Sequence, residues 1–245
     1  SVYNKKSKKF VDRLYNFGIA KPVISSIKGE PRPKIPHPND ESWSGLSLPW
    51  MTYGYGVRMT PMQILTFYNS IANEGEVVKP KFIHSTRKFG TNENKIYPKQ
   101  ILNKSIFSNY TNKILKRMLY DVVHHENGTA KNIKSMHLKL SGKTGTAQVD
   151  YAKDSVNYIS SFVGYFPSDK PKYSCIIVIN KPNKVKGYYG NKVAAPVFKR
   201  IAEKIFSKYP KVEKYNLDEL NENIKISKIQ IENKSKLNKI VSNGT

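Results

Sequence analysis

Three extended segments separated by short polar links occupy the second half of the chain, and they constrain its fold more than any other feature. They run from His137 to Val149, from Tyr158 to Phe166 and from Tyr173 to Asn180. Links this short join antiparallel neighbours, whereas parallel strands need a crossover of a dozen or more residues. Apolar residues at helical spacing follow between Val193 and Ser207, and such a helix can cover one face of the sheet. We therefore expect a mixed α/β (α+β) fold, an antiparallel sheet flanked by helices.

The first half of the chain predicts helices separated by a proline-rich stretch. Residues 7–18 carry an apolar stripe that ends at Gly18, and residues 108–125 carry a longer one. Thr60-Pro61 is typical of a helix start, because the threonine caps and a proline at the first position loses no hydrogen bond. Six prolines in 19–50 predict a long surface excursion, and Val77 to Ile83 predicts a strand that enters an extended arm. The expected inner faces are Ile64, Leu65, Tyr68, Ile71 and Ala72 in the second helix, and Ile114, Leu115, Met118, Leu119, Val122 and Val123 in the third.

The net charge of +24 permits two interpretations. One is a non-catalytic basic module that binds an acidic polymer. The other is compositional drift, because lysines far outnumber arginines and occur beside many Asn, Ile and Tyr, all of which AT-rich codons specify. Nucleic-acid readers favour arginine for bidentate contacts, and the chain has neither zinc-finger spacing nor an RNA-recognition aromatic box, so we favour drift and expect no nucleic-acid partner. Cys175 is the only cysteine, which excludes an internal disulfide.

Two further properties bear on the organisation of the chain. Apolar runs stay well short of the ~18 residues that a membrane-spanning helix needs. Beyond residue 210 the sequence turns polar and rich in Lys and Asn, so we expect 1–210 to form the folded part and 211–245 a basic, polar tail.

The most informative stretch for function is Ser141 to Gln148, which holds Lys143, Thr144, Gly145 and Thr146 on one extended segment. On a strand, Thr144 and Thr146 share one face and alternate with Lys143 and Gly145. A glycine lets a ligand lie against the backbone, whose N–H groups can stabilise an oxyanion while hydroxyls and an ammonium hold a carboxylate. A phosphate-binding loop is excluded, because the position that its first glycine requires holds His137.

The order and spacing of several short motifs resemble the transpeptidase domain of class B penicillin-binding proteins, which are cell-wall enzymes related to serine β-lactamases. The resemblance runs from about residue 8 to 208 and is greatest for the cell-division (septal) branch. The motifs that carry it are Gly54-Tyr55-Gly56, Thr60-Pro61-Met62-Gln63, Ala72-Asn73-Glu74-Gly75, Val122-Val123, Gly128-Thr129-Ala130, Lys143-Thr144-Gly145-Thr146-Ala147-Gln148, Ser161-Phe162-Val163-Gly164-Tyr165-Phe166-Pro167, Tyr189-Gly190 and Ala194-Ala195-Pro196-Val197-Phe198.

The resemblance implies a peptidoglycan D,D-transpeptidase that cross-links stem peptides through a serine acyl-enzyme, without cofactor or metal. It implies that Lys143 helps to bind the substrate carboxylate and serves the proton network. The hydroxyls of Thr144 and Thr146 would hold the carboxylate of a D-Ala-D-Ala stem or a β-lactam, the Thr146 N–H would complete the oxyanion hole, and Gly145 would permit close approach. Implied partners are the stem peptide, β-lactams and division-machinery proteins. The implied location is the periplasmic face of the bacterial inner membrane, with the anchor outside this chain.

The family also needs a Ser-x-x-Lys box and a Ser-x-Asn box before Lys-Thr-Gly. Two Ser-x-x-Lys strings occur, at 25–28 and 85–88, but glycines follow both and neither opens an apolar helix. Ser155-Val156-Asn157 comes after Lys143 and is therefore in the wrong order. We expect the chain to be a C-terminal portion, incomplete at its N-terminus and inactive alone, with one sheet face and the apolar side of the helix at 61–74 left without a partner.

Overall fold

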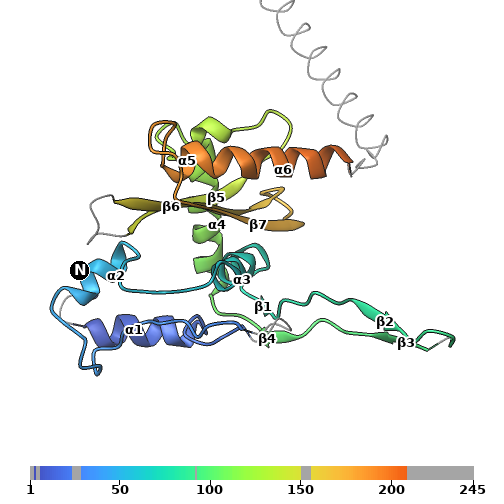
Figure 1. Ribbon diagram of the computed structural model, residues 1–245, viewed down its shortest axis with the longest axis horizontal. Helices are drawn as coiled ribbons and strands as arrows, with labels where there is room; N and C mark the ends of the chain where they lie inside the picture. The colour runs from blue at the N-terminus through green and yellow to red at the C-terminus, as the bar shows by residue number, and fades with distance from the viewer. Residues whose placement is uncertain (1–2, 4–5, 24–28, 92, 150–155, 209–245) are drawn as a thin grey trace, which may run out of the picture. The chain divides into compact units, whose positions relative to one another are not determined.

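The computed structural model describes residues 3, 6–23, 29–91, 93–149 and 156–208. It divides the chain into two units, Ser1–Lys204 and Ile205–Thr245, and only 205–208 of the second are described. The predicted tail at 211–245 lies outside the described residues. Figure 1 shows the elements, which in chain order are α1 (Ser7–Asn16), α2 (Ser47–Thr52), α3 (Pro61–Ala72), β1 (Val77–Val78), β2 (Ser85–Arg87), β3 (Asn94–Ile96), β4 (Ile101–Asn103), α4 (Asn109–His124), the 3₁₀ helix η1 (Lys131–Ile133), β5 (Ser141–Val149), β6 (Asn157–Phe166), β7 (Tyr173–Asn180), α5 (Gly190–Val193) and α6 (Ala195–Lys208).

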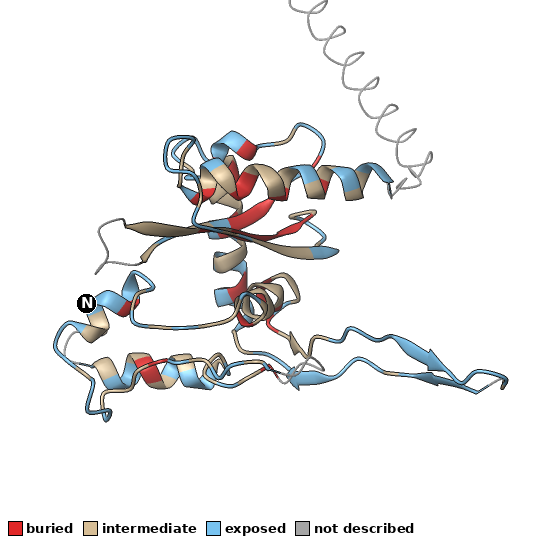
Figure 2. Ribbon diagram, viewed as in Figure 1, coloured by how far each residue is buried: buried red, intermediate tan, exposed pale blue. Residues whose placement is uncertain are grey.

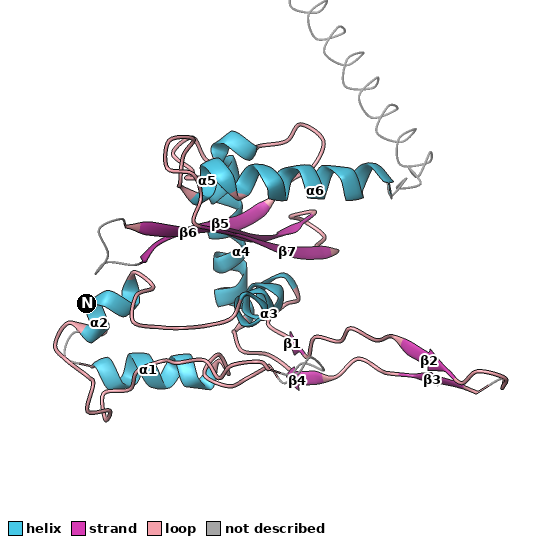
Figure 3. Ribbon diagram, viewed as in Figure 1, coloured by secondary structure: helices cyan, strands magenta, loops and turns pink. Residues whose placement is uncertain are grey.

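The central sheet has the strand order β5-β6-β7, with both pairs antiparallel (Figure 3). Its register places Gly145 opposite Ser161 and Val163 opposite Ile176. The three extended segments therefore form the predicted meander. Strand β5, which carries the candidate chemistry, lies at one edge of this sheet.

Helix α6 covers one face of the sheet, as predicted for residues 193–207, although a separate short helix, α5, precedes it. Phe198 is fully buried, with its ring centre 4.8 Å from that of Phe162 and 5.7 Å from that of Phe166. Tyr165, on the opposite face of β6, packs against Ile71 of α3 and Leu119 of α4. Strand β6 is thus covered on both faces, as its run of buried residues in Figure 2 shows. The expectation that one sheet face and the apolar side of α3 lack partners is wrong.

A capping box fixes the start of α3, which confirms the prediction made from Thr60-Pro61. The Thr60 hydroxyl accepts from the Gln63 N–H (3.2 Å), and the Gln63 side-chain oxygen accepts from the Thr60 N–H (2.8 Å). The buried Gln63 amide also donates to Glu30 and to the Pro31 carbonyl. One glutamine therefore orients the helix and holds the proline-rich stretch against it.

The proline-rich stretch is more than a surface excursion. It contains α2, and Ile35 and Met51 are buried in a cluster with Val11 of α1. Pro49 is tolerated inside α2 because it lies in the first turn, where backbone N–H groups have no intrahelical acceptor. The predicted strand at Val77 to Ile83 is also shorter than expected, since only β1 pairs there, with β4.

The inner face of α4 differs in part from the predicted one. Leu119 and Val123 are buried, but Ile114 is 42% exposed and Met118 is 60% exposed. The polar Asn112 takes a buried position instead, where its amide donates to Glu74 over 3.0 Å. The Asn112 Oδ1 atom is buried and has no hydrogen-bond partner among the described residues. A hydrophobic pattern cannot anticipate a core position that a polar side chain occupies through one specific partner such as Glu74.

Candidate active site

The edge strand β5 presents the residues that the sequence singles out. Ser141 and Gly142 are buried where the strand begins, whereas Lys143 and Thr146 are exposed further along. At the far end, the Gln148 N–H donates to the Tyr55 hydroxyl over 3.3 Å. The middle of β5, between its buried start and its hydrogen bond to Tyr55, is the part that a ligand can reach.

The Lys143 ammonium lies against its own strand and donates a hydrogen bond to the Thr144 carbonyl over 3.0 Å. Although the residue as a whole is exposed, neighbouring protein atoms partly desolvate the ammonium and lower the pKa of Lys143 below the ordinary lysine value. This lysine therefore offers a positive charge at the strand and loses its proton more readily than a fully solvated lysine.

Residues from elsewhere in the chain fix the two threonine hydroxyls. The Thr144 hydroxyl oxygen lies 3.3 Å from that of Thr129, which follows α4. The Thr146 hydroxyl accepts a hydrogen bond from the Gly190 N–H over 3.0 Å, at the start of α5. Since a hydroxyl that accepts from an N–H keeps its own proton free, Thr146 can donate to an anion.

Glycine is required at two positions, in β5 and beside it, because neighbouring protein atoms approach the backbone closely. A Cβ added to Gly145 would lie 2.5 Å from the Ser161 hydroxyl oxygen. A Cβ added to Gly190 would lie 2.5 Å from the carbonyl oxygens of both Gly145 and Ser161. The protein itself, in the form of Ser161, therefore occupies the space beside Gly145 in which the sequence suggested a ligand.

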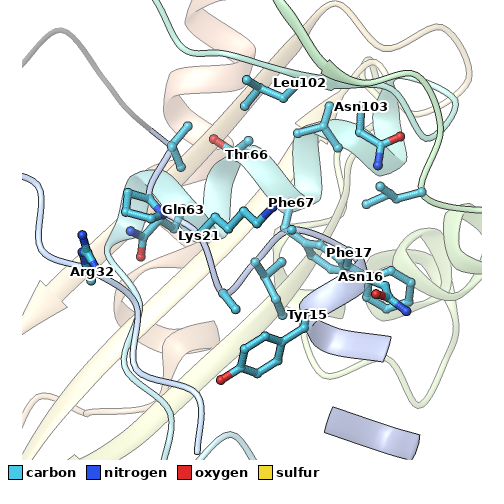
Figure 4. A pocket seen from close by; sticks show the side chains of 17 residues that line it. Tyr15, Asn16, Phe17, Lys21, Arg32, Gln63, Thr66, Phe67, Leu102 and Asn103 are labelled. Carbon is cyan, nitrogen blue, oxygen red and sulfur yellow. The ribbon is translucent and has the colours of Figure 1, made fainter. Parts of the chain in front are cut away.

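A cavity of about 850 Å³ lies away from β5. Figure 4 shows its walls, which include Phe17, Gln63, Phe67 and Leu102. No residue of β5 lines it. The candidate chemistry thus lies outside this cavity, on a strand at the edge of the sheet.

Of the Ser-x-x-Lys and Ser-x-Asn sequences considered above, only some lie among the residues that the structure describes. Ser85–Arg87 forms the exposed strand β2, so the serine of 85–88 does not open a helix. The string at 25–28 and Ser155 lie outside the described residues, and Asn157 begins β6. Among the described residues there is no cluster of metal-ligating side chains and no helix long and apolar enough to span a membrane.

Sequence reasoning assigned no role in the site to Thr129, Gly190 or Tyr55. Thr129 and Tyr55 lie in motifs that carry the family resemblance, but no local pattern assigns them to the site, because their partners are 15 and 93 residues away along the chain. Gly190 carries a weak signal of its own, since a glycine at the first position of a helix is consistent with close backbone approach.

Comparison with known proteins gives a consistent result. Residues 4–203 match the family model of the penicillin-binding protein transpeptidase domain. The peptidoglycan D,D-transpeptidase FtsI of Buchnera aphidicola (subspecies Baizongia pistaciae) is 31% identical over 198 residues, which cover 80% of this chain and 32% of that protein. The penicillin-binding protein PbpB of Mycolicibacterium smegmatis is 30% identical over 212 residues, covering 82% of this chain and 32% of PbpB. The chain therefore spans about a third of the length of these relatives.

Solved structures resemble the fold over the same region. The apo form of penicillin-binding protein 3 from Mycobacterium tuberculosis has a TM-score of 0.71 and 26% identity, and the match covers 82% of this chain and 46% of that one. The same protein in complex with ampicillin has a TM-score of 0.70. These similarities agree with the β-lactamase/transpeptidase-like fold expected from the sequence.

Proposed function

Since this chain belongs to the penicillin-binding protein transpeptidase family, we propose that it supplies one wall of a peptidoglycan D,D-transpeptidase active site. The observation that carries the proposal is the arrangement on β5. An ammonium, two positioned hydroxyls and exposed backbone lie within four consecutive residues, Lys143 to Thr146, of an edge strand. That combination suits a peptide that ends in a carboxylate.

In this proposal, Lys143 and Thr146 are the catalytic residues of the chain. Lys143 attracts the terminal carboxylate of a D-Ala-D-Ala stem and stabilises the protonation state of its neighbours. The Thr144 and Thr146 hydroxyls bind that carboxylate, and the Thr146 N–H stabilises the oxyanion. Gly145 keeps the strand free of a side chain that would collide with Ser161.

The nucleophile in this proposal is a serine outside residues 1–245. The family's serine opens an apolar helix as the first residue of a Ser-x-x-Lys box, and neither Ser-x-x-Lys string of this chain is expected to open such a helix. Its hydroxyl oxygen attacks the carbonyl of the penultimate D-Ala and its proton passes to the departing D-Ala amine. The amine of a second stem peptide then attacks the ester, which forms the cross-link and returns a proton to the serine oxygen.

We further propose that residues 1–210 form the C-terminal part of the transpeptidase domain and that 211–245 form a separate basic tail. The proposed ligands are stem peptides and β-lactams, the proposed partners are division proteins, and the proposed location is the periplasmic face of the inner membrane. The relative named peptidoglycan D,D-transpeptidase FtsI supports the stem peptide as a ligand, and the ampicillin complex of the similar structure supports β-lactams.

A labelled penicillin tests the proposal. The complete protein that contains this chain should form a covalent adduct that survives denaturation, and residues 1–245 alone should form none. An adduct on 1–245 that disappears on Ser25→Ala or Ser85→Ala would place the nucleophile within the chain. Failure of the complete protein to react would overturn the transpeptidase assignment.

A further inference from the structure

A two-stranded arm projects from the region between α3 and α4 and is not used by the proposed reaction (Figure 1). We define the basic arm as residues 79–104, which include β2, β3 and β4. Most of the arm is coloured as exposed in Figure 2, and every residue of β2 and β3 is exposed. An isolated two-stranded ribbon is at best marginally stable in water, so this arm gains little from its own contacts.

The charge of the arm is strongly one-sided. Its only acidic residue is Glu93, which lies 3.7 Å from Lys88. The basic residues are Lys79, Lys81, Arg87, Lys88, Lys95, Lys99 and Lys104. Lys99 also pairs with Glu76, which precedes the arm. Two carboxylates cannot neutralise seven cations, so the arm keeps a net positive field along its length.

Large apolar side chains are exposed on the same arm. Phe89 near the tip is fully exposed, and others lie along the arm as far as its base: Phe82, Ile83, Ile96, Ile101 and Leu102. The register places Arg87 and Ile96 on one face of the ribbon, and Thr86 and Lys95 on the other. Lysines alone would be sufficient to protect exposed strands from pairing with other chains. They do not explain the run of exposed apolar side chains, which is typical of an interaction surface.

The unpaired backbone edges of the ribbon limit the kinds of partner that can bind the arm. Strands β2 and β3 pair only with each other among the described residues, so each has an outer edge that another strand can join. A peptide backbone satisfies such an edge, whereas a lipid surface or a nucleic acid does not. The apolar groups also extend from base to tip rather than gathering at the tip, as insertion into a membrane would require.

We propose that the basic arm is a docking surface for an extended, acidic segment of another protein, which adds as a strand along one edge of the ribbon. Acidic side chains of the partner would meet the lysines, and its alternating apolar side chains would cover the exposed Ile and Phe residues. A second copy of this chain is a poor occupant, because its arm carries the same positive charge.

The test measures binding of a fluorescent decapeptide of alternating glutamate and valine to the complete protein that contains this chain. Neutralising three lysines of the arm (Lys81→Gln, Lys88→Gln, Lys95→Gln) should weaken binding about tenfold or more, as loss of several charge pairs does. Neutralising three exposed lysines elsewhere (Lys139→Gln, Lys184→Gln, Lys186→Gln) makes the same change in net charge and should have less than a twofold effect. Phe89→Ser with Ile96→Ser should also weaken binding, although the charge is unchanged.

Three outcomes would overturn the proposal. Equal losses in the two lysine variants would mean diffuse attraction to a basic protein. Equal binding of a glutamate–glycine decapeptide, which favours strands poorly, would mean that the ribbon edge is not used. Tight binding of phosphatidylglycerol vesicles that the arm variants abolish, with no binding of the decapeptide, would identify a lipid surface. None of these readouts depends on acylation, so the proposal stands or fails apart from the transpeptidase assignment.

Discussion

The backbone N–H of Gly190 donates to the Thr146 hydroxyl over 3.0 Å, and this bond ties the start of α5 to the candidate strand. The two residues are 44 positions apart in the sequence. The approach is possible because Gly190 lacks a Cβ, which would otherwise lie 2.5 Å from the Gly145 carbonyl oxygen. The direction in which the Thr146 hydroxyl points therefore depends on a residue outside the Lys-Thr-Gly box.

Gly190→Ala should slow acylation of the complete protein by a labelled penicillin about 10- to 100-fold, as small misplacements of a binding group do. The added methyl must push α5 away from β5, which removes the N–H that orients Thr146. The measurement is the second-order acylation rate. The loss should be smaller for the methyl ester of the same penicillin, because the ester has no carboxylate for the hydroxyl to bind.

Gly45→Ala is the matched control, since a Cβ at Gly45 meets no atom within 4 Å. It should leave both the rate and the melting temperature unchanged. If Gly190→Ala reacted with both the acid and the ester at the normal rate, Gly190 would not position Thr146.

Lys143→Ala should reduce acylation of the complete protein about 100-fold or more, which is typical for loss of a preorganised charge. The ammonium lies on the exposed edge strand beside Thr144, where the proposal places the carboxylate. The measurement is again the acylation rate, with Lys139→Ala as a control at an exposed lysine just before β5. An unchanged acylation rate in Lys143→Ala would mean that the segment from Lys143 to Thr146 is not part of the active site.

The lowered pKa of Lys143 predicts the alkaline side of the pH profile. Desolvation brings the folded-state pKa below the free value of 10.5, so acylation that needs the ammonium should decline below that pH. Lys143→Arg should move the decline to higher pH, because a guanidinium keeps its proton. Between the folded and free pKa values the unfolded chain binds more protons, so stability from this group should rise with pH. A decline at the same pH in Lys143→Arg would assign it to another group.

The elements that sequence predicted best are those with local causes. The capping box at Thr60 and Gln63 uses residues three apart, and the meander of β5, β6 and β7 follows from short links between apolar segments. Helix α2 was missed, because Pro49 signals a break in the sequence and its tolerated place in the first turn is visible only in three dimensions.

The candidate strand was predicted from sequence, but the groups that orient it were not. Lys143 to Thr146 stand out as a local pattern, whereas Thr129 and Gly190 reach them through tertiary contacts. The exposure of Met118 on α4 is a similar case, since periodicity identifies an apolar side chain but not which neighbour covers it.

Phe198→Ala should destabilise the domain by about 3–5 kcal/mol, the usual cost of removing a buried aromatic ring. Its ring is fully buried between Phe162 and Phe166, so the deletion leaves a cavity between α6 and the sheet. Denaturant unfolding of the complete protein measures the loss. Arg200→Ala, an exposed change on the same helix, is the control and should cost well under 1 kcal/mol. Equal effects of the two changes would mean that α6 does not cover the sheet.

Residues 1–245 alone should bind a hydrophobic dye strongly and unfold over a broad temperature range. The sheet and α3 are covered, but Ile114 and Met118 of α4 are 42% and 60% exposed, and β5 and β7 have open edges among the described residues. Burial of apolar surface contributes about 25 cal/mol per Å², against a net stability of only ~5–15 kcal/mol for a domain. Exposed apolar groups therefore leave a small margin of stability, and we expect the charge of +24 to oppose aggregation without improving the packing.

Substitutions on α4 test whether its exposed apolar side chains, rather than loose packing of the whole chain, cause the dye binding. Ile114→Gln with Met118→Gln should reduce dye binding without lowering the melting temperature, because neither side chain is buried in the chain alone. Val185→Gln, a change at an exposed residue outside the helices, is the control and should leave dye binding unchanged. The complete protein should bind less dye than residues 1–245, since the proposed remainder of the domain would cover α4. A sharp melt of residues 1–245 above ~65 °C, the upper end for mesophile domains, without dye binding would show that they complete their own core.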